Sequence, residues 1–158
     1  MLSARIIPCL DIKDGRVVKG QQFVNIVDVD DPEVLAEYYY KAGDDELVFY
    51  DITATNHGRK NSLDFITKVA QQTTIPFAVG GGIASLDDIA NVLEKGAHKV
   101  SINSAAIRHP DLLAAAATKF GSQSIVLSID AKQIGQTKWN VFTNGGQINA
   151  GINAVDWA

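Results

Sequence analysis

The feature that most constrains the fold is a regular alternation between short apolar runs rich in β-branched residues and longer segments with helical periodicity. Such an alternation is typical of βα units that build a parallel sheet. Five of these runs predict strands, and their nearly continuous apolar character suits strands buried on both faces. The predicted strands span residues 5–11, 46–52, 76–80, 99–103 and 124–130.

Four helices are predicted between these strands, because residues that favour helix ends flank each periodic segment. Ser and Asp cap helix starts, proline fits the first turn, and glycine adopts the left-handed conformation that ends many helices. The predicted helices lie between Asp31 and Gly43, after Ser62, between Ser85 and Gly96, and between Pro110 and Gly121. The element order is therefore β-α-β-α-β-α-β-α-β, in a single domain over residues 1–158.

Two segments depart from this rhythm. Residues 12–30 are predicted to form an unusually long loop after the first strand, and long loops in compact domains are usually functional. This loop carries Lys13, Arg16 and Lys19. Near the end of the chain, Asn144-Gly145 lies between two strand-like segments and predicts a β-hairpin.

Composition excludes several classes of protein. With 46% hydrophobic residues, 20% charged residues and a net charge of −4, the chain is neither disordered nor suited to electrostatic binding of nucleic acid or anionic lipid. We find no apolar run long enough for a membrane span and no signal-peptide pattern, so we expect a cytoplasmic protein. The three histidines match no metal-ligand spacing, so we expect no metal, and the single cysteine, Cys9, is predicted in the core.

Three aspartates lie where catalytic groups are expected in a parallel α/β protein, at the carboxyl ends of the strands. They are Asp11, Asp51 and Asp130, and each could instead be a helix cap or turn former. Asp11 and Asp130 end the first and fifth strands in similar contexts, Cys-Leu-Asp-Ile-Lys and Ser-Ile-Asp-Ala-Lys. In a closed eight-stranded barrel these two carboxylates face each other across the cavity, which suits a general acid and a general base.

A glycine run and the polar end of the next strand predict a phosphate site. Gly80, Gly81 and Gly82 follow a strand and precede a helix, so their amide groups can approach an anion closely. The alternative is a tight turn that needs positive φ angles. The following strand ends in polar side chains that can complete the site, namely Ser101, Asn103 and Ser104. At the opposite strand ends, Arg5, Glu46 and Lys99 are interpreted from position alone as solvated charges.

Five segments together resemble the cyclase subunit of imidazole glycerol phosphate synthase, an enzyme of histidine biosynthesis. They span residues 5–11, 13–20, 45–54, 80–83 and 99–104, within a similarity that extends along the whole chain. The resemblance implies a TIM-type (βα) barrel. Such a barrel takes about 250 residues, so we expect this chain to supply its first half: four βα units, a fifth strand and a hairpin.

The resemblance also implies an activity and its residues. A glutaminase partner supplies ammonia, and the phosphorylated substrate, a phosphoribulosyl-formimino aminoimidazole carboxamide ribonucleotide, yields imidazole glycerol phosphate and aminoimidazole carboxamide ribonucleotide without cofactor or metal. Asp11 and Asp130 are implied as the acid–base pair, and Lys19 is implied on a loop that covers the substrate. The remaining implied residues are Gly81, Gly82, Asn103 and Ser104 at a phosphate, Arg5, Glu46 and Lys99 at an ammonia gate, and Asp51 and Ser101 on the active-site face.

Several alternatives stay open. The chain can be part of a longer cyclase, or a half-barrel that associates with another copy, since an open half exposes strand edges and apolar surface. It can also be a non-catalytic protein that binds phosphate or a partner through the first-half site. Among enzymes, the sibling phosphoribosyl-formimino isomerase of the same pathway shares the paired aspartates and the glycine loop.

Overall fold

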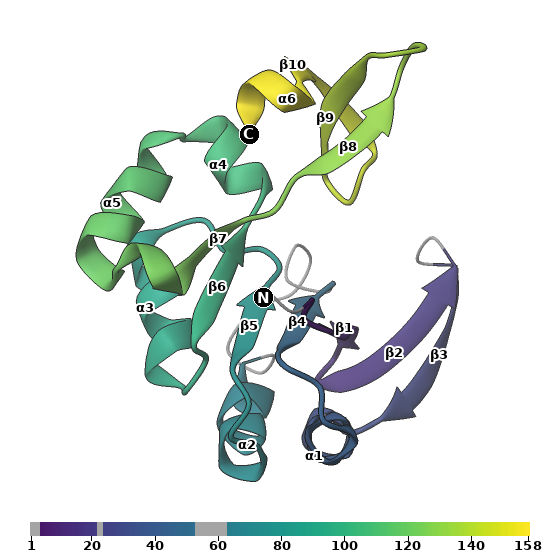
Figure 1. The fold of residues 1–158 in the computed structure, drawn as a ribbon, viewed down its shortest axis with the longest axis vertical. Coiled ribbons are helices and arrows are strands. Elements are labelled where there is room, and N and C mark those ends of the chain that lie inside the picture. Colours follow the sequence, from purple (N-terminus) through teal and green to yellow (C-terminus); the bar gives the residue numbers. More distant parts are fainter. Residues whose placement is uncertain (1–3, 22–23, 53–62) are drawn as a thin grey trace.

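A curved α/β layer with a small β-sheet above one edge makes up the computed structural model (Figure 1), which describes residues 4–21, 24–52 and 63–158. Seven strands form the large sheet in the order β3-β2-β1-β4-β5-β6-β7, and three form the small antiparallel sheet in the order β10-β9-β8. The large sheet contains β1 (Cys9–Lys13), β2 (Arg16–Gln21), β3 (Val24–Asp30), β4 (Leu47–Asp51), β5 (Phe77–Gly80), β6 (Lys99–Ile102) and β7 (Ile125–Leu127). The small sheet contains β8 (Asp130–Gln133), β9 (Trp139–Thr143) and β10 (Ile148–Asn153).

The longer helices lie along the convex side of the large sheet (Figure 1). The helices are α1 (Pro32–Ala42), α2 (Asp64–Gln72), α3 (Leu86–Glu94), α4 (Ser104–Arg108), α5 (Asp111–Phe120) and α6 (Ala154–Trp157), with a 3₁₀ turn at Ser122–Ser124. Strands β1, β4, β5, β6 and β7 are parallel neighbours. Their carboxyl ends therefore meet at one edge, and the predicted α/β fold with a parallel sheet is confirmed.

The core lies between this sheet and its helices. Alternate strand residues point into it, so Leu10 and Ile12 of β1 and Val100 and Ile102 of β6 are buried. Phe49 of β4 is completely buried. Its ring centroid lies 5.6 Å from that of Phe65 of α2 and 5.9 Å from that of Phe77 of β5. These rings connect strands and helix in one apolar cluster, which fixes the positions of the strand ends.

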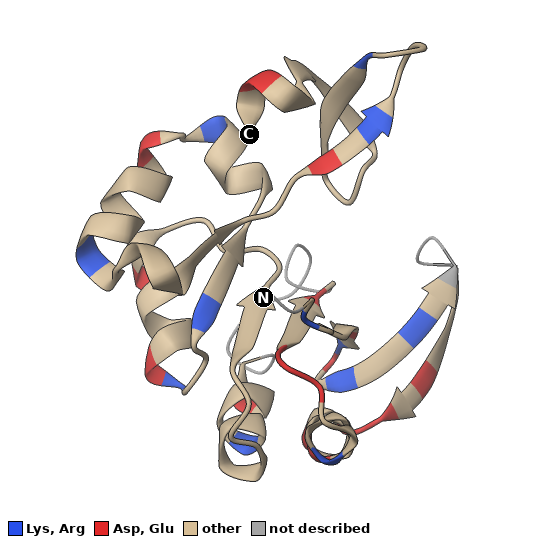
Figure 2. Cartoon of the chain, in the orientation of Figure 1, with Lys and Arg blue, Asp and Glu red and all other residues tan. Residues whose placement is uncertain are grey.

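The long loop predicted over residues 12–30 was wrong, because most of this segment forms β-structure. Strand β1 turns at Asp14 and Gly15, both with positive φ (51° and 79°), into antiparallel β2, and β2 pairs with β3. Figure 2 shows basic residues on β2 beside acidic ones on β3. Arg16 donates to both carboxylate oxygens of Asp28 at 2.9 and 2.7 Å and also to Asp31, and the Arg16 hydrogen bond lowers the pKa of Asp28.

The first and fifth strands differ from their predicted bounds. Strand β1 begins at Cys9 rather than at residue 5, because Pro8 has no amide hydrogen to donate to a ladder. Strand β7 ends at Leu127, and the Ser128 amide makes the last bond across to Ile102. The chain then leaves the large sheet, so Asp130 begins β8 of the small sheet instead of ending the fifth strand.

The four predicted helices are present as α1, α2, α3 and α5. In α1, Pro32 and Ala36 are buried and Leu35 and Tyr39 pack on the core, whereas Val34 and Tyr38 are exposed. The short helix α4 was not predicted. The proposed cap Ser62 lies outside the described residues.

Cys9 is exposed, not in the core as predicted. In β1, Leu10 and Ile12 occupy the helix-facing positions, so the period-two geometry of the strand turns Cys9 to the other face of the sheet. Val126 of β7 is also exposed. Among the described residues, no helix covers this concave face (Figure 1).

Candidate active site

A cavity of about 1300 Å³ lies at the carboxyl edge of the parallel strands. It is lined by eight of the residues that the sequence singled out: Asp11, Asp51, Gly81, Gly82, Ser101, Asn103, Ser104 and Asp130. These residues come from β1, β4, the segment after β5, β6, α4 and β8, which meet here because all five parallel strands end at this edge. One cavity therefore unites both predicted carboxylates with the predicted phosphate loop.

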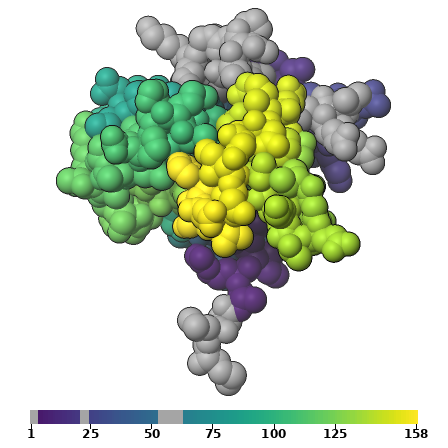
Figure 3. All heavy atoms as spheres, turned by 90° about the horizontal axis from the view of Figure 1, so that it is seen from above, coloured from purple at the N-terminus to yellow at the C-terminus, as the bar shows by residue number. Residues whose placement is uncertain are grey.

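The small sheet forms part of the cavity wall, which the sequence did not reveal. Asn144, Gly145 and Gln147, in or beside the turn between β9 and β10, line the cavity. The Asn144 amide donates to Ser104 Oγ at 3.4 Å, which connects this turn to the start of α4. Seen from above, the C-terminal residues of β10 and α6 lie against the region of α4 and α5 (Figure 3).

Asp11 is the middle residue of β1, and its side chain is half-buried on the concave side of the sheet. Burial raises its pKa above the ordinary value of 3.8, because removal from water disfavours the charged form. The pKa of the neighbouring Cys9 thiol is raised too, first because the thiol of this exposed residue is still partly removed from water by the sheet, and then by the charge of Asp11. Asp11 thus holds its proton to a higher pH than an exposed carboxyl group does.

Gly81 has a structural reason to be glycine. Its φ is +101°, and a Cβ atom there would lie 2.1 Å from the Asp51 carbonyl oxygen, which is far inside contact distance. The backbones after β4 and β5 therefore approach each other at a point where any side chain is excluded. Gly82 also has positive φ (57°) but is exposed toward the cavity. This run thus combines a tight turn with residues that line the cavity.

Two buried polar oxygens, on residues that line this cavity, have no hydrogen-bond partner among the described residues. They are Ser101 Oγ, on a residue only 4% exposed, and Asn103 Oδ1. A buried oxygen without a partner costs about 1–3 kcal/mol, so such groups are usually satisfied by a ligand or by water. Both residues lie beside Gly81 and Gly82, since β6 is the parallel neighbour of β5.

Lys19 does not line the cavity. It lies on β2, paired with Val27 of β3, and its side chain is exposed. Lys13, at the end of β1, does line the cavity, as do Tyr50 and Arg108. The Lys13 position could have been found from the sequence, because Lys13 follows Asp11 by two residues and so faces the same side of the strand.

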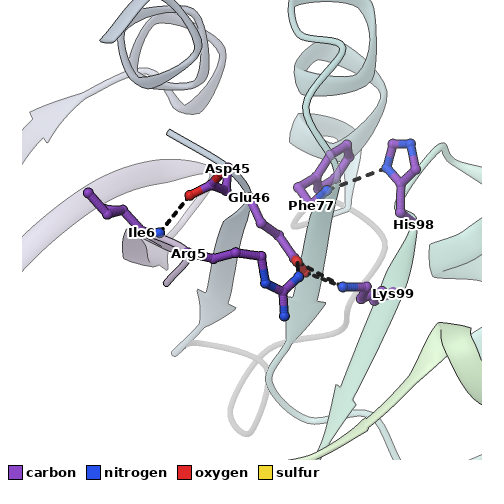
Figure 4. A network of polar contacts seen from close by, with 7 residues as sticks. All are labelled: Arg5, Ile6, Asp45, Glu46, Phe77, His98 and Lys99. Atoms are coloured by element: carbon purple, nitrogen blue, oxygen red, sulfur yellow. Dashed lines mark hydrogen bonds and ion pairs between the residues drawn. The ribbon is translucent and has the colours of Figure 1, made fainter. Parts of the chain in front are cut away.

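At the opposite end of the strands, Arg5, Glu46 and Lys99 form one charged cluster (Figure 4). Glu46 is only 5% exposed, so the interpretation of these residues as solvated charges was wrong. Lys99 Nζ donates to both Glu46 carboxylate oxygens at 2.7 and 2.8 Å, and Arg5 Nη1 lies 3.1 Å from Oε2. The carboxylate is buried because two cations compensate for its loss of water.

Beside this cluster, the imidazole of His98 packs edge-on against the ring of Phe77 with centroids 5.5 Å apart. Its Nδ1 accepts a hydrogen bond from the Phe77 amide at 3.4 Å. Within the described residues, no group of three or more His, Cys, Asp or Glu side chains is arranged to hold a metal ion. In the same part of the chain, no helix is both long and apolar enough to cross a bilayer.

Comparison with known proteins identifies the family. Residues 5–158 match the family described as "Histidine biosynthesis protein". The chain belongs to this family. Its relatives in the histidine biosynthesis family include proteins named "Imidazole glycerol phosphate synthase subunit HisF", 59% identical in Oceanobacillus iheyensis and 54% identical in Bacillus cereus strains AH187 and Q1. These similarities cover all 158 residues of this chain but only 62–63% of the length of the relatives.

Membership of the histidine biosynthesis family agrees with the observed architecture. Five parallel strands with helices on their convex side constitute part of a TIM-type barrel. In such barrels active sites lie at the carboxyl ends of the strands, where the cavity of this chain is found.

Proposed function

We propose that this chain provides the first-half active site of the cyclase subunit of imidazole glycerol phosphate synthase. The observation that carries the proposal is that Asp11, Asp130 and the loop of Gly81 and Gly82 line one cavity. The names and identities of the relatives support the same assignment. The chain then acts in histidine biosynthesis as the N-terminal part of a barrel, formed by the single domain 1–158.

Asp11 and Asp130 are the proposed proton-transfer groups. Closing an imidazole ring with ammonia requires protons to leave the attacking nitrogen and to reach the departing nitrogen, which becomes the amino group of the released aminoimidazole carboxamide ribonucleotide. The raised pKa of Asp11 brings it closer to the neutral range in which one carboxyl group can both accept and donate a proton. Asp130 projects from the small sheet into the same cavity and supplies the second carboxylate.

The phosphate of the substrate is proposed to bind at the ends of β5 and β6. Gly81 and Gly82 bring the backbone to the cavity wall, while Asn103 and Ser104 offer side-chain donors at the start of α4. The Ser101 hydroxyl has no partner among the described residues, which supports a ligand that accepts a hydrogen bond from it. Lys19, on the neighbouring hairpin, and Asp51, at the end of β4, are proposed to complete the substrate-binding side.

Ammonia is proposed to enter from the opposite end, where Arg5, Glu46 and Lys99 form their cluster (Figure 4). A glutaminase subunit docked against this end is the proposed source. From there ammonia is proposed to reach Asp11 along the concave face of the strands, which Cys9 and Asp11 share in β1. The proposed chemistry uses ammonia as its nitrogen source and needs no redox cofactor.

The first test is ammonium-dependent turnover of the phosphoribulosyl-formimino substrate by the purified chain. Asp11→Asn is expected to abolish turnover, whereas Asp44→Asn, a matched change far from the cavity, is expected to leave it intact. Turnover in wild type that survives in Asp11→Asn contradicts the assignment. Turnover of the isomerase substrate instead favours the sibling isomerase.

A second candidate function, phosphate binding without catalysis, is favoured by the Ser101 hydroxyl, a donor without a partner among the described residues on a residue that lines the cavity. Inorganic phosphate titrated into the folded chain distinguishes it. Saturable phosphate binding with no turnover, by a chain shown to be folded, supports the binding function for this chain alone. Size-exclusion chromatography on the same sample reports whether copies associate through the uncovered concave face.

A further inference from the structure

The segment that precedes β1 is attached to the rest of the fold by a pair of reciprocal hydrogen bonds. Residues 4–8 have no regular secondary structure. The Ile6 amide donates to Asp45 Oδ2 at 2.7 Å, and the Asp45 amide donates back to the Ile6 carbonyl oxygen at 3.1 Å (Figure 4). The two hydrogen bonds join Ile6 and Asp45 in a ring, and Asp45 directly precedes Glu46.

This ring adjoins the charged cluster on both sides. Arg5 precedes Ile6, and Glu46 follows Asp45, so the bonds hold the two backbones together at the point where Arg5 meets Glu46. The side chain of Arg5 is 61% exposed, and burial therefore contributes little to its placement. The position of Arg5 depends on its backbone.

Lys99 and Glu46 do not depend on this attachment. Lys99 begins β6, which is held by the ladder to β5, and it binds both oxygens of the buried Glu46 carboxylate. In this cluster, the sheet holds the Lys99–Glu46 pair, whereas Arg5 is placed only by the segment of residues 4–8. Loss of the Ile6–Asp45 contact affects Arg5 selectively.

We propose that Asp45 is a positioning residue: its carboxylate fixes the Ile6 amide and thereby places the Arg5 guanidinium on Glu46. The positioning rests on the contacts alone. Its consequence, control of ammonia entry through the cluster, rests on the proposed function.

The chain offers matched variants for a test. Asp45→Ala removes the acceptor of the Ile6 amide, and Asp45→Asn removes the charge but keeps an acceptor oxygen. Asp44→Ala removes the adjacent carboxylate, which makes no hydrogen bond or ion pair within the described part of the chain, and leaves its backbone bond to Tyr39 in place. Ile6→Pro deletes the donor of the same bond while both carboxylates stay.

The measurement is hydrogen exchange of the Arg5 guanidinium, followed by nitrogen-15 NMR in the full 158-residue chain. We expect exchange to be about threefold faster in Asp45→Ala, the size of effect that a partly exposed ion pair produces. Ile6→Pro should match Asp45→Ala, whereas Asp45→Asn and Asp44→Ala should match wild type. Rescue by asparagine separates positioning from a general charge effect.

Unchanged Arg5 exchange in both Asp45→Ala and Ile6→Pro overturns the proposal, and so does equal acceleration by Asp44→Ala. The Lys99 ammonium resonance provides an internal check, because it should stay constant in every variant. In the turnover assay, Asp45→Ala should alter the dependence of rate on ammonium concentration, with Asp45→Asn close to wild type. Absence of turnover by folded wild type means that these 158 residues alone do not complete the active site, and the exchange result then decides the positioning role independently.

Discussion

Replacing Gly81 by alanine tests the close approach of β4 and β5 beneath the candidate phosphate loop. Two costs arise at this position. A side chain at positive φ costs about 1–2 kcal/mol, and forcing an extra methyl group into a filled space costs about 1–3 kcal/mol. The added Cβ atom would lie 2.1 Å from the Asp51 carbonyl oxygen and 2.9 Å from the Asp51 backbone nitrogen, and backbone atoms cannot rotate away. We therefore expect Gly81→Ala to lower the free energy of unfolding by about 2–5 kcal/mol.

Gly43 provides the matched control. Its φ is +88°, and no atom of the described residues lies within 4 Å of the position that a Cβ atom would take, so Gly43→Ala carries only the backbone cost of about 1–2 kcal/mol. Urea unfolding followed by circular dichroism gives the change in the free energy of unfolding for both variants. Phosphate titration of the same variants measures whether the glycine loop still binds phosphate. Equal destabilisation by the two substitutions would refute the reasoning, because it would mean that the contact between Gly81 and Asp51 costs nothing to disturb.

Three further changes have defined outcomes. Lys99→Met leaves the buried Glu46 carboxylate with only the exposed Arg5 as a partner. We expect urea unfolding to show that the free energy of unfolding falls by about 1–3 kcal/mol, and by less in Lys99→Arg. Burial raises the folded-state pKa of Asp11 above 3.8, so the folded chain binds the Asp11 proton more tightly than the unfolded chain does. The contribution of Asp11 to stability therefore falls as pH rises from about 4 toward neutral. Asp11→Asn should therefore be more stable than wild type in unfolding at neutral pH, with the difference shrinking in acid; a constant difference contradicts this. Ser101→Ala removes an unpartnered buried hydroxyl, so we expect unchanged or higher thermal stability but phosphate binding about tenfold weaker by titration.

Local patterns were sufficient to predict the parallel sheet and its helices. Apolar runs such as that of β4 and end signals such as Ser85, whose hydroxyl accepts from the Asp88 amide, act within a few residues. The hairpin of β1 and β2 was missed although its signal is local as well. Asp14-Gly15 is a dipeptide that favours a two-residue hairpin turn, and both residues have the positive φ that such a turn requires.

The charged cluster could not be predicted from local patterns. A glutamate at a strand start is ordinarily exposed, and only the folded sheet shows that Arg5 and Lys99 reach Glu46 from 41 and 53 residues away. The resemblance to a known family placed these three residues together, whereas position along the chain favoured solvent. The catalytic and binding roles of Asp11, Asp130 and the phosphate loop remain predictions, supported by their shared cavity.

Asp11 and Asp130 belong to two different sheets, and this has a mechanical consequence. No single hydrogen-bond ladder sets the distance between the two carboxylates, because the chain passes from one sheet to the other through Ser128 and Ile129. A rotation of the small sheet about this connection would change the carboxylate separation while leaving the large sheet intact. Substitutions in the β9–β10 turn, where Asn144 contacts Ser104, can therefore act as hinge mutations on the proposed proton transfer, by changing how often the two carboxylates come close together.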